Sequence, residues 1–160
     1  MRVCLQRVSR ASVTVEDEIV GKIDAGYLIL LGVSAEDDLE DIEMLTAKIA
    51  NLRILDDENG VMNCSALDYL AENPDSVAML VVSQFTLYGD VRKGRRPSWI
   101  KAAPPEVARP IAEQFCAALS EQGFKVEQGV FGAEMAVELV NDGPVTIWLD
   151  GDELRKPRRG

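Results

Sequence analysis

Two apolar runs set the strongest limit on how this chain can fold. Val77–Val82 is almost continuously apolar, and Tyr27–Val33 has the same character. Runs of this length without polar alternation are typical of strands that are buried on both faces. A sheet built on such strands needs a covering layer on each side, so helices or more sheet must pack around it.

Two segments have the helical period that such a covering layer requires. Asp37–Leu52 repeats apolar residues every three to four positions, and Pro105–Gln122 does the same before Gly123 ends it. Ser34 is the expected cap of the first helix, and Pro110 is expected to delay the regular start of the second. The acidic run from Glu36 to Glu43 suits a helix N-terminus, so we interpret it as a capping, solvated face.

The remaining apolar segments predict further strands. They are Arg2–Ser9, Ser12–Val20, Phe124–Val126, Glu134–Val140 and Val145–Leu149, the last two forming a terminal hairpin. The order is two strands, two strand-helix units and three strands, with no repeat or linker. The sequence therefore predicts a mixed α/β protein with a single domain over residues 1–160.

Composition excludes several kinds of chemistry. The 160 residues contain no histidine, which removes Ser-His-Asp and Cys-His catalysis and the common zinc sites. Cys4, Cys64 and Cys116 are far apart and form no CxxC, which favours free thiols in a reducing cytoplasm. Neither a membrane-spanning run nor a secretory signal is expected, because the N-terminus enters a strand at once.

Positive charge is concentrated in two short clusters of an acidic chain. The net charge is −10, which disfavours general binding to nucleic acid. Four basic residues nevertheless lie within 92–96 and four within 155–159. The segment DVRKGRRPSW around the first cluster has the composition of a loop that contacts phosphates and stacks on bases, or of a basic surface loop with Trp99 in the core. The second cluster is either a polyanion contact or a solvated tail.

The stretch Asn141–Thr146 joins two predicted strands with an unusual turn. Asn, Asp, Gly and Pro all favour tight turns, and here they are adjacent. Pro144 fixes φ and removes a donor where the second strand should begin to pair. Such a turn is either a simple connector or a rigid tip that presents bare backbone, and turn chemistry alone favours the connector.

Polar residues follow the apolar run Val77–Val82. Ser83, Gln84, Phe85 and Thr86 lie at the carboxyl end of a buried strand, where α/β proteins commonly place sites. Gln84 is a possible donor to a carbonyl oxygen, and backbone amides at the strand end can form an oxyanion hole. Thr86 is a candidate nucleophile without a histidine to activate it, so spacing alone favours a capping or core role for the hydroxyls.

Four stretches together resemble the D-aminoacyl-tRNA deacylases of the bacterial and eukaryotic type. They are MRVCLQRVSRASVTV, SQFTLYGD followed by KGRRPSW, GVFGAEM, and NDGPVTIWLD. The resemblance covers nearly all of the chain and includes the family's SQFTL and N-x-G-P-V-T motifs, intact and in order.

This resemblance implies both an activity and a fold. The expected enzyme is a hydrolase that cleaves the ester of D-aminoacyl-tRNA, which is chirality proofreading in translation, and that removes glycine from mischarged glycyl-tRNA(Ala). It implies a cytoplasmic homodimer with tRNA as partner and without metal, cofactor or membrane. The implied fold has mixed sheets and two main helices in a three-layer α/β/β arrangement.

The resemblance also assigns roles to particular residues. The catalytic pocket is expected to be lined by Ser83, Gln84, Phe85 and Thr86. A Gly-cisPro motif, inserted from one subunit into the site of the other, corresponds to Gly143 and Pro144, and Arg7 helps to hold it. The terminal adenine is expected at Phe131, Gly132 and Met135.

Physical reasoning agrees with these assignments. A rigid backbone wall at the position of an L side chain excludes every L residue, leaves the D side chain free and cannot reject glycine. An aminoacyl ester is already activated, and the neighbouring 2′-hydroxyl can assist, so no histidine is needed. Thr86 is therefore expected to position the substrate rather than to attack it.

Three alternatives remain on sequence grounds. A tRNA- or RNA-binding module without catalysis leaves the SQFT pocket unused. A general small-ester hydrolase leaves the basic cluster at 92–96 without a role. A related proofreading enzyme with a changed substrate preference is disfavoured by Arg7.

Overall fold

A six-stranded sheet forms the centre of the computed structural model, which describes residues 1–157. Its strands are β1 (Arg2–Val15), β2 (Glu18–Ile23), β3 (Gly26–Gly32), β6 (Ala78–Ser83), β7 (Lys125–Gln128) and β8 (Ala136–Asp150). A small separate sheet holds β4 (Leu55–Asp56) and β5 (Met62–Cys64). The helices are α1 (Leu39–Asn51), α2 (Ala66–Glu72), the 3₁₀ helix η1 (Phe85–Tyr88), α3 (Pro105–Glu121) and α4 (Gly151–Arg155).

Strand β1 organises the sheet because it pairs with three neighbours. The order is β2-β1-β3-β6-β7, and β8 also pairs with β1. The pairs that β1 makes are antiparallel, whereas β3, β6 and β7 run parallel. The mixed α/β architecture predicted from the sequence is confirmed.

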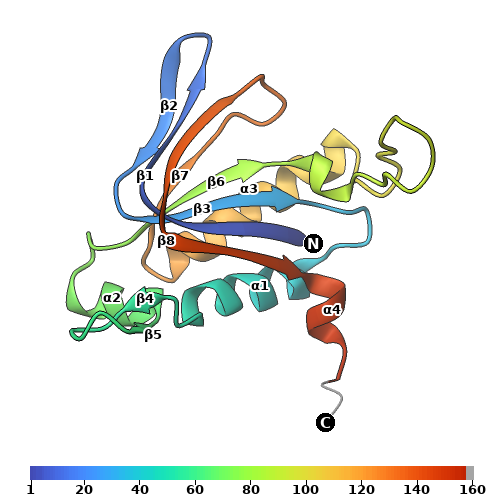
Figure 1. Cartoon of the computed structure of the whole chain (residues 1–160). Helices are drawn as coiled ribbons and strands as arrows, with labels where there is room; N and C mark the ends of the chain where they lie inside the picture. The colour runs from blue at the N-terminus through green and yellow to red at the C-terminus, as the bar shows by residue number, and fades with distance from the viewer. Residues whose placement is uncertain (158–160) are drawn as a thin grey trace.

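Two apolar cores lie on opposite faces of this sheet. The larger core joins Leu5, Ile29 and Met79 of the sheet to Leu45 of α1 and Phe115 of α3. The smaller core is made by alternate residues of the same strands together with Ile23 of β2. Figure 1 shows α1 and α3 on one face, while the β1–β2 end of the sheet bends away from them. Helix, sheet and folded-over sheet therefore form the three layers.

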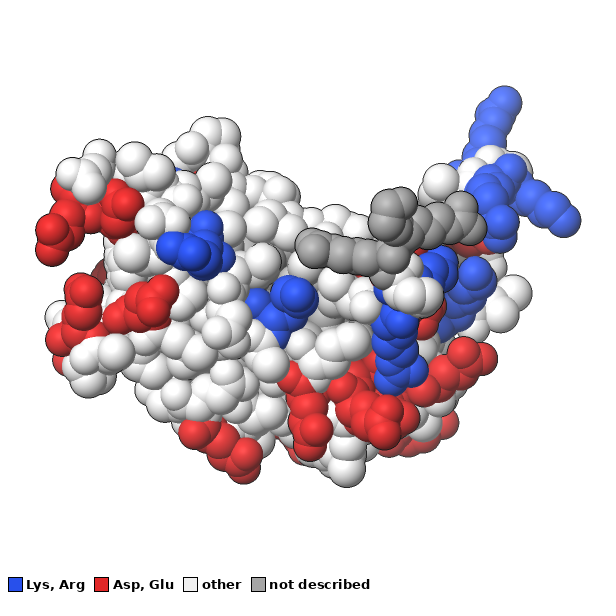
Figure 2. Space-filling view, turned by 90° about the horizontal axis from the view of Figure 1, so that it is seen from below, with Lys and Arg blue, Asp and Glu red and all other residues white. Residues whose placement is uncertain are grey.

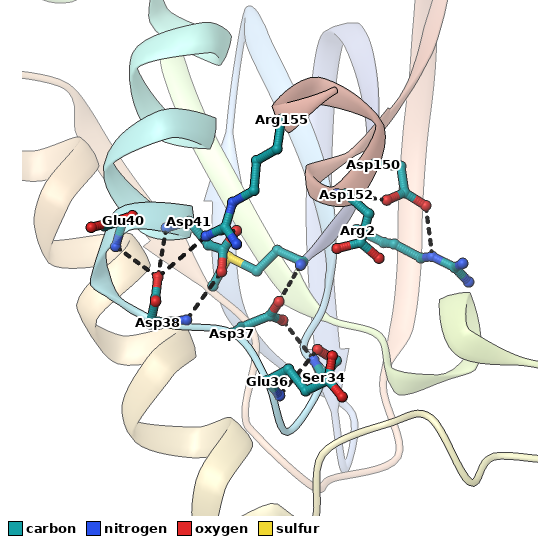
Figure 3. Close-up of polar contacts among 11 residues, drawn as sticks. Arg2, Ser34, Glu36, Asp37, Asp38, Glu40, Asp41, Asp150, Asp152 and Arg155 are labelled. Atoms are coloured by element: carbon teal, nitrogen blue, oxygen red, sulfur yellow. Dashed lines mark hydrogen bonds and ion pairs between the residues drawn. The ribbon is translucent and has the colours of Figure 1, made fainter. Parts of the chain in front are cut away.

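Acidic residues at the start of α1 cap the helix, and one of them, Asp41, is buried. Asp38, not Ser34, is the N-cap, and its side chain accepts from the amides of Glu40 and Asp41. Asp41 is only 3% exposed, and its Oδ1 lies 2.8 Å from Arg155 Nη2 of α4. Figure 3 shows this cluster with Asp37, which pairs with the N-terminal amine. The predicted capping is confirmed, but the solvated face is wrong at Asp41, because Arg155 offsets the cost of its burial.

Three boundaries differ from the sequence prediction. The first strand does not break between Ser9 and Ser12 but continues to Val15. It turns at Glu16 and Asp17, whose positive φ values of 49° and 66° match the twist of a tight hairpin. Pro110 lies inside α3 and does not delay its start.

The predicted terminal hairpin is also wrong. Asn141–Thr146 lies within β8, whose two flanks run in one direction and both pair with β1. Val8 is opposite Asn141 and Gln6 is opposite Thr146, so four residues of β8 bulge out against the single residue Arg7. Pro144 is tolerated because a bulged residue needs no donor for the ladder.

No helix within residues 1–157 is long and apolar enough to cross a membrane. In the basic tail, Arg155 and Lys156 make ion pairs with Asp41 and Glu153. Arg158 and Arg159, the rest of that cluster, lie outside the described residues.

Candidate active site

A cavity of about 540 Å³ opens at the carboxyl end of β6. Its floor is the end of the parallel sheet, with Leu31, Val33 and Val82. One side comes from Ser83, Gln84 and Phe85, and the opposite side from the loop and strand that follow β7. That second side contains Phe131, Gly132, Ala133, Met135 and Val137. The cavity lies where open α/β sheets bind ligands, as the sequence predicted.

The SQFT segment changes direction at this edge. The backbone N–H of Gln84 donates to Leu31 O at 2.7 Å, which is the last hydrogen bond between β3 and β6 on this side. The 3₁₀ helix η1 then begins at Phe85. The first backbone N–H groups of a helix have no hydrogen-bond acceptor within that helix, and this applies to the start of η1. Within residues 1–157, the N–H groups of Phe85 and Thr86 donate to no acceptor. Two backbone donors are thus available beside the cavity.

The side chains of this segment divide into buried and exposed groups. Ser83 and Gln84 are half-buried, whereas Phe85 is 56% exposed and Thr86 is also exposed. Gln84 Nε2 donates to Thr86 Oγ1, which orients both groups. Among the described residues, the Thr86 hydroxyl makes no hydrogen bond with a basic or acidic side chain that could activate it as a nucleophile.

Aromatic residues border the cavity mouth. Phe85 and Trp99 pack edge to face with ring centroids 5.4 Å apart, and Trp99 itself is 40% exposed. On the other side, the guanidinium of Arg109 lies 4.8 Å from the ring centroid of Phe131. Flat apolar walls of this kind suit a planar ring system more than a small aliphatic group.

A basic loop projects beside Trp99. The backbones of Asp90 and Ser98 pair in an isolated antiparallel bridge at the base of this loop. The side chain of Arg92 binds the carboxylate of Asp90. Hydrogen bonds from Arg92 hold the pKa of Asp90 well below its usual range, so Asp90 stays charged. The other three cations of the 92–96 cluster are exposed and make no ion pair within residues 1–157.

Charge is segregated over the surface of the molecule. Figure 2 shows basic residues gathered at the end that carries the projecting loop of Figure 1, while acidic residues dominate the opposite end. The projecting loop therefore brings positive charge to an acidic protein near Trp99, which lines the cavity.

Arg7 anchors the bulge in β8. Its Nε donates to Asp142 O at 3.0 Å, and its Nη1 donates to Ile54 O at 2.6 Å and lies 3.2 Å from Asp56 Oδ1. The guanidinium is 7% exposed and packs against Gly143, where a Cβ would lie 1.8 Å from Nη2. Only glycine fits there, since φ at Gly143 is +89°.

The predicted cis bond before Pro144 is not present. Residues 1–157 contain no cis peptide bond, so Gly143–Pro144 is trans in this structure. The positive φ of Gly143 turns the chain within the bulge, and Pro144 then re-enters β8 through a trans bond. The Asp142–Pro144 tip is exposed.

The structure thus gathers most of the predicted residues but in two groups. Phe131, Gly132 and Met135 line the cavity with Ser83, Gln84 and Phe85. Arg7, Gly143 and Pro144 belong to the bulge and do not line that cavity within one protomer. Sequence reasoning missed the cavity residues Ala102, Ala103 and Pro105, for which composition gives no signal.

Comparison with known proteins now decides the family. The family model described as "D-Tyr-tRNA(Tyr) deacylase" matches residues 4–150. This chain belongs to that family. The prediction of family membership is confirmed.

Relatives of known name agree with this over the whole chain. A D-aminoacyl-tRNA deacylase of Thermomicrobium roseum is 58% identical over 97% of both chains, and one of Thermosipho africanus is 54% identical over 96% of this chain and 99% of its own. Among solved structures, a c-Myc DNA Unwinding Element Binding Protein is 40% identical, with a TM-score of 0.85 over 94% of this chain and 98% of that one. A probable eukaryotic D-amino acid tRNA deacylase, 18% identical with a TM-score of 0.77 over 92% of this chain and 97% of that one, shares the fold.

Proposed function

We propose that this protein hydrolyses the ester bond of D-aminoacyl-tRNA and releases the D-amino acid and free tRNA. The expected enzyme class, a hydrolase acting on aminoacyl-tRNA, is confirmed by the family and its relatives. One observation carries the mechanism: a cavity with flat apolar walls meets two unpartnered backbone amides, in a chain without histidine.

The chemistry needs charge stabilisation more than a nucleophilic side chain. Attack on an ester carbonyl develops negative charge on its oxygen, and the N–H groups of Phe85 and Thr86, which have no acceptor within residues 1–157, would donate to it. The attacking water is assisted by the 2′-hydroxyl of the terminal ribose, which the substrate itself brings. Gln84 and Thr86, joined by their hydrogen bond, orient the carbonyl and the water.

The terminal adenosine occupies the apolar side of the cavity. Phe131 and Met135 offer packing surface, and Gly132 leaves the approach open, since nothing lies within 4 Å of its Cβ position. The aminoacyl group then points toward Ser83 and Phe85, at the end of β6.

Chirality is selected by backbone from a second copy of the chain. The exposed Gly143–Pro144 tip of one protomer enters the cavity of its partner in a homodimer and fills the space that an L side chain requires. D residues direct their side chains away from this wall, and glycine has none, so glycyl-tRNA(Ala) is also a substrate. The wall rests on the four-residue bulge and its anchor Arg7, not on a cis bond.

The positively charged loop is an argument for tRNA as the binding partner. The protein would meet tRNA in the cytoplasm. Lys93, Arg95 and Arg96 belong to the exposed loop that leads into Trp99, and Trp99 lines the cavity, so an RNA backbone that delivers a 3′ end would pass near this loop. Phosphate contacts of this kind position the substrate without reading its sequence.

The deciding experiment is deacylation of matched D-tyrosyl-tRNA, L-tyrosyl-tRNA and glycyl-tRNA(Ala). We expect hydrolysis of the D and glycyl esters and survival of the L ester. Equal hydrolysis of D and L forms contradicts the wall, and binding without turnover contradicts the enzyme. Turnover of D-tyrosine methyl ester at a comparable rate would instead indicate a general esterase.

Thr86→Ala tests the division of labour within the site. We expect substantial D-tyrosyl-tRNA hydrolysis to remain, because the amide of residue 86 is retained. Complete loss of activity in the folded variant, together with a trapped acyl-enzyme in the wild type, contradicts the positioning role.

A further inference from the structure

The two ends of the β8 bulge, at Asn141 and Val145, form its neck. One side chain, that of Asn141, holds these two ends together. Its Nδ2 donates to Arg7 O on β1 at 2.9 Å and to Val145 O on β8 at 3.1 Å. Asn141 directly precedes the four bulged residues, and Val145 is the last of them. A single carboxamide therefore ties both ends of a four-residue excursion to each other and to the neighbouring strand.

These bonds replace ladder bonds that the bulge removes. Opposite a bulge, a strand loses its regular partners, and carbonyl groups left without donors are costly when they are screened from water. Pro144 has no N–H to offer, so the backbone of the bulge cannot supply all of the missing donors. The two amide hydrogens of Asn141 satisfy one carbonyl on each strand.

Neighbouring groups match the orientation that the two donor bonds already give this carboxamide. Asn141 Oδ1 lies 3.4 Å from the hydroxyl of Thr146, which donates to it, and Thr146 Oγ1 accepts from Gln6 Nε2 at 3.3 Å. The acceptor side of the amide is thus occupied, which leaves its donor side directed at the two carbonyls. Val145, 9% exposed, holds the far end of the bulge in the core.

Arg7 and Asn141 act on different parts of the same bulge. Arg7 holds the tip, because its Nε donates to Asp142 O and its guanidinium packs against Gly143. Asn141 closes the neck, and its own backbone partner across the sheet is Val8. The tip has no other side-chain hydrogen bond among the described residues, so its position depends on these two anchors.

We infer that Asn141 is a specificity-determining residue: its side-chain amide holds the bulge in the shape that excludes L-aminoacyl esters. This rests on the proposed function, in which the Gly143–Pro144 tip is the chiral wall. Asn141 does not touch substrate, so it is a positioning residue. Loosening the neck lets the tip retreat and admits an L side chain, while the amides of the SQFT segment remain in place for D esters.

The test is the ratio of kcat/KM for D-tyrosyl-tRNA to that for L-tyrosyl-tRNA. Two hydrogen bonds of ordinary strength hold the neck, so we expect Asn141→Ala to lower this ratio by about tenfold or more through faster L hydrolysis. Asn141→Asp, which keeps the shape but lacks both N–H donors, should lower it as well. The ratio is independent of the folded fraction, because both substrates are cleaved by the same active molecules.

Thr146→Val is the matched control. It removes a hydroxyl from the same network but leaves the two donor bonds of Asn141, so the D to L ratio should stay within about threefold of wild type. Faster amide hydrogen exchange at Gly143 and Val145 in Asn141→Ala, but not in Thr146→Val, is the expected structural signature.

The outcomes separate this inference from the proposed function. If wild type cleaves neither ester, or cleaves both equally, the proposed function fails. If wild type is D-selective and both Asn141 variants keep the wild-type ratio, the role of Asn141 is overturned while the proposed function stands. Lower thermal stability with an unchanged ratio overturns it in the same way, because it shows a structural role alone.

Discussion

Replacement of Gly143 by alanine should cost more stability than any change in backbone strain can explain. Gly143 has φ of +89°, and an alanine Cβ there would lie 1.8 Å from Arg7 Nη2 and 3.0 Å from its Cζ. The positive φ alone costs an L residue about 1–2 kcal/mol. The clash adds a second cost, because Arg7 must move its guanidinium away.

The size of that second cost follows from what holds Arg7. Its Nη1 bond to Ile54 O is 2.6 Å and its Nε bond to Asp142 O is 3.0 Å. Its carboxylate partners, Asp56 and Asp142, have side chains 51% and 57% exposed, so their ion pairs are screened and add little. Loss of one bond from the buried cation to a carbonyl costs about 1.5–3 kcal/mol. We expect a total loss of about 2.5–5 kcal/mol.

Gly60→Ala is the control for this experiment. Gly60 also has a positive φ, +73°, but nothing lies within 4 Å of its Cβ position. It should lose only the backbone cost of about 1–2 kcal/mol. The assay is urea unfolding at fixed protein concentration, with melting as a second measure, where the difference corresponds to roughly 2–4 °C per kcal/mol for a chain of this size. Equal losses in the two variants would refute the role assigned to Arg7.

Three further predictions concern the surface and the titrating groups. Joint replacement of Lys93, Arg95 and Arg96 by alanine should raise KM for D-tyrosyl-tRNA about tenfold and flatten its salt dependence, with D-tyrosyl-adenosine hydrolysis unchanged; a steep salt slope in the variant contradicts the loop assignment. Hydrogen bonds from Ser65 lower the pKa of Asp68 in the folded state, so this stabilisation is present above its unfolded pKa and is lost as pH falls through the folded value. Melting curves from pH 7 to pH 3 should therefore show a smaller acid-side decrease for Asp68→Asn, and identical curves argue against it. Burial raises the pKa of Cys116 to about 12, so iodoacetamide at pH 8 should label it only after unfolding, which mass spectrometry of the alkylated peptide checks.

Elements whose signal is local were predictable from the sequence. The apolar run near Val77–Val82 became β6, and the helical period of Asp37–Leu52 became α1, because burial on two faces and on one stripe leave distinct patterns. The position of polar residues after a buried strand predicted a candidate site at the end of β6, and a cavity lies there. Helix α2 was not predicted, because its seven residues are too short for a helical period, although the capping box of Ser65 and Asp68 is a local signal for its start.

Elements whose shape depends on distant partners were not predictable. Asn141–Thr146 has every local property of a hairpin turn, and only the length of β1 decides that both flanks pair with the same strand. The burial of Asp41 was not predictable either, because its partner Arg155 lies 114 positions later in the chain. Local propensity was overruled at both places by long-range pairing.

The pairing of β1 with β8 also has a consequence for synthesis on the ribosome. Val3 pairs with Leu149 and Val13 with Val137, so the first strand of this sheet in chain order completes its hydrogen bonds with the last one. Contacts of such wide sequence separation form slowly, and they cannot form before residues 136–150 have left the exit tunnel. Until then one edge of β1 stays open, so the nascent chain should depend on chaperone protection until β8 has been synthesised, and the sheet should close only afterwards.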